Sequence, residues 1–191
     1  MNILVACEYS GRVRDAFIKA GHDAMSCDLL PTEQPGPHYQ GDVRDVLHSK
    51  KWDMIIAHPE CKYLANSGVR HLFTDVTRWP KLFDAAEFFK LFVTVDCDKV
   101  CIENPIQHKY ARQLIGKEYT QIIQPWQFGH GETKATCLWL KGLPPLEPTN
   151  IVNGREQRIH KLPPSKDRSK IRGLTYQGIA DAMANQWGNL Q

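Results

Sequence analysis

The sequence lacks the features that mark membrane, secreted and repetitive proteins. No apolar run approaches about 18 residues, so a membrane span is not expected. The first residues, MNILVACEYSGR, contain no basic segment followed by a long apolar stretch, so no signal peptide is expected either. Neither an internal repeat nor a low-complexity tract is present. The length of 191 residues, with 42% hydrophobic and 24% charged residues, predicts a single compact domain over residues 1–191.

Cysteine is scarce, and its spacing does not suggest a scaffold. The six cysteines lie at positions 7, 27, 61, 97, 101 and 137, and no CxxC pair occurs. Disulfide scaffolds belong to short secreted chains, so we expect reduced thiols and a cytoplasmic location. Cys97-x-x-x-Cys101 and His58-x-x-Cys61 have spacings that zinc tolerates, which leaves zinc as an alternative. Cys101 falls inside a predicted strand, however, and we predict no metal site.

Positive charge is concentrated late in the chain. The formal net charge is only +3, but residues 155–172 carry seven Lys or Arg against Glu156 and Asp167, which is +5. Such a segment can bind phosphates, or it can be an ordinary solvated basic loop. Charge alone does not decide between these two interpretations.

Short apolar runs alternate with helical patterns along the chain, which predicts an α/β fold with a mostly parallel sheet covered on both faces. Leu30–Gln40, with three prolines, and the stretch 144–173, which has little periodicity, are predicted loops. In parallel sheets the chemistry lies at the carboxyl ends of the strands. The predicted strands are Asn2–Cys7, Ala24–Cys27, Trp52–Ala57, Val100–Glu103, Tyr119–Gln124 and Thr136–Leu140. The predicted helices are one with Val13, Phe17 and Ala20 on one face that stops at Gly21, and the segments Trp79–Val93 and Ile179–Trp187.

Two residues at predicted strand ends have side chains that could take part in a reaction. Cys61 follows a buried strand in a loop shaped by Pro59, where a thiolate would be a nucleophile; a buried structural cysteine is the common alternative. Glu103 follows three apolar strand residues, where a carboxylate is costly to bury unless it is hydrogen-bonded or protonated. It is either a partner for a base ring or a solvent-exposed turn residue.

The order of short motifs resembles that of the DNA (cytosine-5) methyltransferases over about the whole chain. CEYSG at 7–11 corresponds to the family's glycine-rich cofactor loop, Asp28 to its acidic ribose contact and Gly41-Asp42-Val43 to its adenine contact. His58-Pro59-Glu60-Cys61 corresponds to the Pro-Pro-Cys loop, and Glu103-Asn104-Pro105 to Glu-Asn-Val. FGHGETKATCLWL at 128–140 resembles the Gln-x-Arg-x-Arg strand, and Gly188-Asn189 the late Gly-Asn. Short phage-encoded cytosine methylases look closely similar.

This resemblance implies a Rossmann-like domain of the class I S-adenosylmethionine-dependent methyltransferase type. The substrate would be a DNA cytosine flipped out of the duplex. The Cys61 thiolate would add to C6, Glu103 would hold the ring, and Lys134 would keep a cation near the base. The implied cofactor contacts are Glu8, Ser10, Gly11, Asp28, Asp42, Val43, Pro59 and Asn189. The implied DNA contacts are Asn104, Arg155, Arg158, His160 and Lys161.

The chain departs from the family in ways that bear on its substrate. Residues 141–178 form a short basic insert where the family has a large recognition domain, so we expect low or very short sequence specificity. Glu8 and Ser10 replace two cofactor-loop glycines, and Glu60 replaces a proline. Two alternatives therefore stay open: C5 modification of a free pyrimidine nucleotide, and an inactive nucleic-acid-binding module. The resemblance to phage enzymes implies the cytoplasm of a phage host, and no oligomeric state is predicted.

Overall fold

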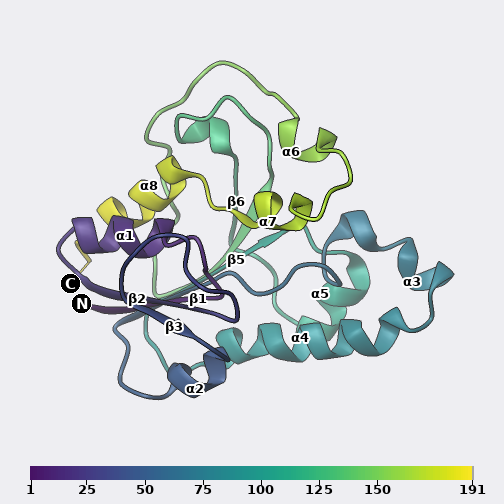
Figure 1. Ribbon diagram of the computed structural model, residues 1–191, viewed down its shortest axis with the longest axis horizontal. Coiled ribbons are helices and arrows are strands. Elements are labelled where there is room, and N and C mark those ends of the chain that lie inside the picture. Colours follow the sequence, from purple (N-terminus) through teal and green to yellow (C-terminus); the bar gives the residue numbers. More distant parts are fainter. Residues whose placement is uncertain (191) are drawn as a thin grey trace.

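One seven-stranded sheet forms the centre of the protein (Figure 1). The computed structural model describes residues 1–190. The strands are β1 (Asn2–Ala6), β2 (Asp23–Asp28), β3 (His38–Gln40), β4 (Met54–Ala57), β5 (Val100–Pro105), β6 (Gln121–Ile123) and β7 (Thr136–Lys141). Their order across the sheet is β3-β2-β1-β4-β5-β7-β6. Strands β1 to β5 pair in parallel, and β7 is antiparallel to both neighbours, so the predicted α/β class with a mostly parallel sheet is confirmed.

Helices and 3-10 turns connect and cover these strands. The α-helices are α1 (Arg12–Lys19), α2 (Val43–Leu47), α3 (His71–Thr74), α4 (Arg78–Thr94), α5 (Lys109–Ile115), α6 (Arg158–Lys161), α7 (Arg168–Gly173) and α8 (Gln177–Trp187). The 3-10 turns are η1 (Asn66–Gly68) and η2 (Pro125–Gln127). Within residues 1–190, no helix combines the length and the apolar character needed to cross a membrane.

The strand residues alternate between two hydrophobic cores, one on each face of the sheet. Leu4 and Ala6 of β1 point into the core that α2, α4 and α5 cover. Ile3 and Val5 point into the core that α1 and α8 cover. Figure 1 shows these two groups of helices on opposite sides of the sheet. Because successive side chains of a strand face opposite ways, a central strand covered on both sides has to be apolar throughout.

The structure corrects the predicted boundaries at three places. The predicted loop Leu30–Gln40 ends in a strand, because His38–Gln40 pairs in parallel with the end of β2. Strand β5 continues through Asn104 and Pro105, because these residues pair with Cys137 and Thr136 of β7. The aperiodic stretch 144–173 contains the short helices α6 and α7. None of these features has an apolar period that sequence analysis could detect.

The order of the strands fixes where a ligand can bind. The chain moves outward from β1 to β3 and then returns to β4 on the other side of β1, so the carboxyl ends of β1 and β4 form the switch point of the sheet. Open α/β sheets bind ligands at such a point. Because β7 runs antiparallel, its amino end comes to the same edge, beside the carboxyl end of β5.

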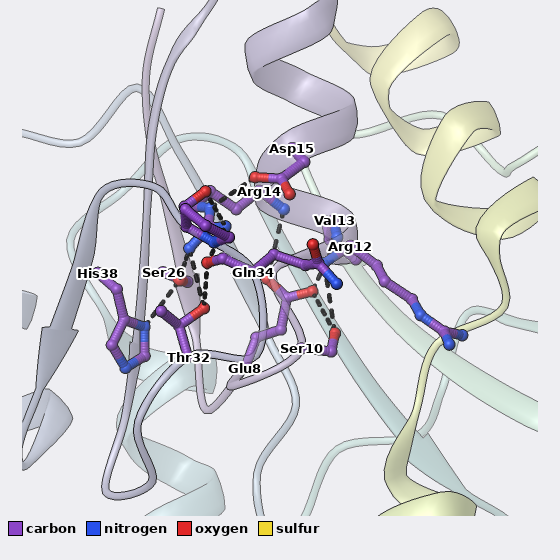
Figure 2. Close-up of polar contacts among 11 residues, drawn as sticks. Glu8, Ser10, Arg12, Val13, Arg14, Asp15, Ser26, Thr32, Gln34 and His38 are labelled. Atoms are coloured by element: carbon purple, nitrogen blue, oxygen red, sulfur yellow. Dashed lines mark hydrogen bonds and ion pairs between the residues drawn. The ribbon is translucent and has the colours of Figure 1, made fainter.

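A fully buried arginine connects α1 to the segment between β2 and β3 (Figure 2). The side chain of Arg14 is 0% exposed, and its Nε donates to the carboxylate of Asp15 at 2.7 Å. Its terminal nitrogens donate to the hydroxyls of Ser26 and Thr32, both at 3.2 Å, and to the carbonyl of Gln34 at 3.0 Å. A buried charge is costly unless it is paired and hydrogen-bonded, and this network meets that need.

We predict that Arg14→Ala lowers the free energy of unfolding by about 3–5 kcal/mol, because it leaves buried acceptors without a donor. Urea denaturation followed by circular dichroism measures this loss. The matched control is Arg44→Ala, which removes an ion pair with Asp42 whose side chains are 56% and 44% exposed. The control is expected to cost under about 1 kcal/mol. Equal losses in the two variants would contradict the structural role of Arg14.

Candidate active site

The loop after β1 turns sharply and directs a carboxylate into the protein. Cys7 has a φ of 58°, the one positive φ outside glycine within residues 1–190. The carboxylate of Glu8, 5% exposed, accepts hydrogen bonds from the amides of Val13 at 2.8 Å and Arg14 at 3.3 Å. A negative charge at a helix N-terminus is favourable. Glu8 therefore caps α1, and its side chain is occupied inside the protein rather than presented to a ligand.

Ser10 and Gly11 also have structural duties in this loop. The Ser10 hydroxyl, 4% exposed, donates to Glu8 at 3.0 Å and accepts from the amide of Arg12 at 3.3 Å. Gly11 has a φ of 75°, and a Cβ at this position would lie 2.5 Å from Nη2 of Arg14. The glycine is required by the backbone and by the buried arginine, whatever its role toward a cofactor.

Two carboxylates lie beside this loop, at the ends of β2 and β3. Asp28 accepts from the amide of Leu30 at 2.9 Å, and burial raises its pKa. Asp42 caps α2 by accepting from the amide of Arg44 at 2.9 Å, which lowers its pKa. Burial, together with the charges of Asp28 and Asp42, raises the pKa of the Cys7 thiol. The structure thus brings both predicted cofactor aspartates to the switch point, whereas Val43 is 3% exposed and belongs to the core.

The loop after β4 presents Cys61. Pro59 is buried, and its carbonyl accepts from the side-chain amide of Asn104 at 2.9 Å, while Glu60 is exposed. The Cys61 carbonyl accepts from two later amides, at 3.0 and 2.9 Å, which closes a helical turn. Burial raises the pKa of the Cys61 thiol, and the charge of Lys134 opposes this shift. These hydrogen bonds hold the loop before and after Cys61. The raised pKa favours the thiol form of Cys61.

Glu103 is paired with His58, a contact that sequence analysis did not assign. Nδ1 of His58 lies 2.7 Å from Oε2 of Glu103, and the two side chains are 10% and 11% exposed. Burial raises the pKa of Glu103, but the hydrogen bond and charge of His58, with Lys134 and Thr175, outweigh burial and lower the pKa to about 2. Burial lowers the pKa of His58, and Glu103 outweighs it, so the net shift is upward. Each partner therefore favours the charged form of the other.

The strand register contained a signal for this pair. Ala57 of β4 is opposite Ile102 of β5, so His58 and Glu103 are the next residues along two adjacent parallel strands. Each is the first ionisable residue after an apolar strand. Nε2 of His58 is buried and has no hydrogen-bond partner within residues 1–190.

Lys134 reaches the same place because of the direction of β7. It lies two residues before β7, whose first residue is opposite Pro105 of β5. Its Nζ donates to the carbonyl of Leu174 at 3.0 Å, and its charge acts on His58, Cys61 and Glu103. The structure therefore brings the three predicted catalytic residues, Cys61, Glu103 and Lys134, to one point.

The segment from α7 to the start of α8, residues 168–176, closes over this point; we call it the strap. The Tyr9 hydroxyl donates to the carbonyl of Lys170 at 2.8 Å, and Arg12 donates to the carbonyl of Thr175 at 2.8 Å. The Thr175 hydroxyl donates to Glu103 at 3.3 Å. Beneath the strap is a cavity of about 20 Å³, room for a group the size of one water. The cavity is lined by residues 7–10, His58 and residues 173–175.

Other predicted site residues lie elsewhere or are already occupied. The side chain of Asn189 donates to the carbonyl of Asn185. The carbonyl of the next residue, Leu190, accepts from Lys99, which directly precedes β5. Asn189 therefore lies at the amino ends of the strands, whereas the other site residues lie at the carboxyl ends. Asn104 is 1% exposed and holds Pro59, so it faces the Cys61 loop rather than a polymer. The Gly188-Asn189 motif did not show that the amino end of α8, and not its carboxyl end, lies beside the site.

The predicted DNA contacts of the basic segment are partly committed to internal contacts. Arg158 forms an ion pair with Glu132 at 2.9 Å, and the guanidinium of Arg155 lies 3.9 Å from the ring centroid of Trp126. His160 and Lys161 are exposed in α6. Within residues 1–190 no group of three His, Cys, Asp or Glu is arranged to hold a metal ion. Cys97 and Cys101 belong to different cores on opposite faces of the sheet.

Comparison with known proteins gives a likeness of fold. No family model matches the chain, and no curated protein does. Among solved structures, a protein provisionally described as a DNA modification methyltransferase, encoded within a prophage of E. coli, aligns with a TM-score of 0.51 at 17% identity, over 80% of this chain and 52% of that one.

Two further structures align with lower scores. The methyltransferase EhMeth of Entamoeba histolytica has a TM-score of 0.43 and 13% identity, over 82% of this chain and 57% of that one. A DNMT2 mutant from Spodoptera frugiperda has a TM-score of 0.41 and 14% identity, over 82% and 55%. The chain spans little more than half the length of these proteins. Its sheet order and the prophage structure together show that it has the Rossmann-like fold expected from the sequence.

Proposed function

We propose that this protein methylates C5 of cytosine in DNA, using S-adenosylmethionine and a transient bond between Cys61 and C6 of the base. The observation that carries the proposal is the placement of Cys61, Glu103 and Lys134 at the carboxyl ends of β4 and β5, where Lys134 and Glu103 are close enough for their charges to act on the Cys61 thiol. They come from three separate segments of the chain, and folding alone brings them together. The prophage structure described as a DNA modification methyltransferase supports the same class of reaction.

The residues at the switch point fit the proposed cofactor. Asp28 and Asp42 lie at the ends of adjacent strands, where they would bind the ribose and adenine parts. Residues Cys7–Ser10 and His58 border the cavity beside them, and Nε2 of His58 is buried without a protein partner within the described residues. S-adenosylmethionine, when bound, supplies an electrophilic methyl group.

The protein's own residues would activate the base. Addition of the Cys61 thiolate to C6 makes C5 electron-rich, which divides a difficult substitution into two easier steps. The cation of Lys134 favours the thiolate over the thiol. The His58–Glu103 pair holds one proton, and its transfer through Glu103 to N3 of the ring would neutralise the charge that the addition creates.

Access of the base requires the strap to move. The Thr175 hydroxyl of the strap already donates to Glu103 at 3.3 Å, in the place that a base would take. The hydroxyl contact is longer than the His58 contact at 2.7 Å, so Thr175 is the partner that a base would replace. A small basic insert in place of a recognition domain supports low sequence specificity for this reaction.

We predict that Cys61→Ala reduces methyl transfer by at least about a thousandfold, because the two other thiols on which Glu103 acts, Cys101 and Cys137, are fully buried in β5 and β7 and cannot reach a base. Purified protein is incubated with labelled S-adenosylmethionine and mixed-sequence duplex DNA, and the nucleosides are analysed by mass spectrometry. The control is Cys97→Ala, which should retain activity. Cys97 is a buried cysteine just before the amino end of β5, at the opposite end of the strand from Glu103.

The same assay separates the alternatives. Labelled 5-methyldeoxycytidine from the wild type and its loss in Cys61→Ala support the proposal. In a parallel incubation, dCMP takes the place of the DNA; label on dCMP would replace the proposal with a nucleotide-modifying enzyme. Binding of DNA without a labelled product from either DNA or dCMP would replace it with an inactive binding module.

We predict that Glu103→Gln lowers the pKa of His58 below its ordinary value of about 6.5, because burial then acts without the compensating carboxylate. NMR titration of the histidines measures this shift. The pair stabilises the fold while Glu103 is ionised and His58 is protonated. The stability advantage of the wild type over Glu103→Gln should therefore be complete between about pH 4.5 and 6.5 and decline as the pH rises through the raised pKa of His58.

Urea denaturation at about pH 6 and pH 9 provides the second readout of this prediction. Glu118→Gln is the control, since its carboxylate is 63% exposed and pairs only with a surface arginine. An advantage that stays constant between the two pH values would contradict the ionic assignment of the pair.

A further inference from the structure

A cluster of aromatic rings lies on the surface next to the Cys61 loop. The rings of Phe73, Trp79 and Tyr110 contact one another edge-on, with centroids 5.3 to 6.2 Å apart. Phe73 is 64% exposed, and nearby Val76 is 76% exposed. Figure 1 shows α3, α5 and the beginning of α4 gathered at one end of the molecule. Exposed aromatic groups of this size usually mark an interaction surface.

Cations lie over one ring of this cluster, Tyr110, and over a further ring, Tyr63, in the segment that follows Cys61. Arg78 lies 4.8 Å, Lys62 5.2 Å and Lys81 6.0 Å from the ring centroid of Tyr63. Lys109 lies 4.9 Å from that of Tyr110. Residues 62–81 carry four Lys or Arg against Asp75 alone, which is +3.

The cations of this surface all lack an ion pair with a carboxylate of the described residues, whereas two of the seven cations of the late basic segment have one. Within residues 1–190, Lys62, Arg78, Lys81 and Lys109 form no ion pair with a carboxylate. In the late segment, by contrast, Arg158 and Lys170 are each paired with a glutamate. Unpaired cations interleaved with aromatic rings are suited to phosphates and stacked bases.

This surface is tied to the nucleophile. Arg78 donates to the carbonyl of Lys62 at 3.3 Å, and His108 makes a 2.9 Å contact with the carbonyl of Tyr63. Tyr63 and Trp79 pack on the core of the α4 face, whereas Ile159 and Ile171 of the late basic segment pack on the core of the α8 face. The two positive segments are thus on opposite faces of the sheet, and the Cys61 loop lies between them.

We infer that these residues form a second nucleic-acid contact, in which the cations bind the phosphate backbone and Phe73 stacks on an unpaired base. The inference rests on the proposed function, for which it supplies one wall of the polymer site. The surface consists of Lys62, Tyr63, Phe73, Arg78, Lys81 and Lys109.

The test of the cations uses the full chain, without S-adenosylmethionine, and a fluorescein-labelled DNA duplex of mixed sequence. Anisotropy titrations over a series of salt concentrations compare Lys62→Gln/Lys81→Gln/Lys109→Gln with Lys19→Gln/Lys51→Gln/Lys117→Gln. The control lysines are equally exposed and lie at the amino ends of the strands. Both triple variants lose the same charge. The first should lower the salt slope by about 2–3 and weaken binding roughly tenfold or more, and the control should do neither.

The test of the ring uses a single strand of the same sequence. Phe73→Ala should weaken its binding roughly tenfold, whereas Phe83→Ala, which removes a ring that is 50% exposed outside the cluster, should leave binding unchanged. Equal binding by the two triple variants, or by the two phenylalanine variants, overturns the inference. Because binding is measured without methyl transfer, loss of binding in the surface variants supports the surface even if the wild type forms no methylated cytosine.

Discussion

A carboxylate buried at the end of β5 needs compensation, and the way it is compensated organises the site. His58 supplies a hydrogen bond of 2.7 Å and a positive charge, and it can do so because β4 and β5 are paired in parallel register. A slip of that register by one residue would turn every side chain of β4 to the other face. The core packing of the two strands and the ionisation of Glu103 therefore depend on the same alignment.

The direction of one strand decides which cation joins this pair. In a wholly parallel sheet, the residues before β7 would lie at the far edge, away from the carboxyl ends. Because β7 runs antiparallel between β5 and β6, Lys134 instead lies beside Glu103 and holds the carbonyl of Leu174. The strap and the proposed catalytic groups thus share an anchor, which links access to the site with the charge inside it.

Sequence analysis predicted the strands best where both faces of a strand are buried. β1, β4 and the first half of β5 appear as continuous apolar runs; the loop after β4 holds Cys61, and β5 itself holds Glu103. Periodicity carries no information about strand direction, so the antiparallel β7 was not foreseen. Sequence analysis also missed β3, a strand of three residues at the edge of the sheet that pairs with β2. Side-chain orientation was least accessible: Glu8 and Asn104 occupy motif positions, yet their side chains hold the backbone of neighbouring loops.

The attachments of the strap have a consequence for how the sequence can change over evolutionary time. Tyr9, Arg12 and Lys134 all donate to main-chain carbonyls, those of Lys170, Thr175 and Leu174. A carbonyl is present whatever the side chain, so substitutions along the strap preserve these three bonds provided that the backbone path is kept. The side chains that form these bonds all belong to the rest of the domain and not to the strap. Strap positions are therefore open to diversification unless the side chain has a partner of its own. Lys170 pairs with Glu33, and the hydroxyls of Thr175 and Tyr176 donate to Glu103 and Glu132.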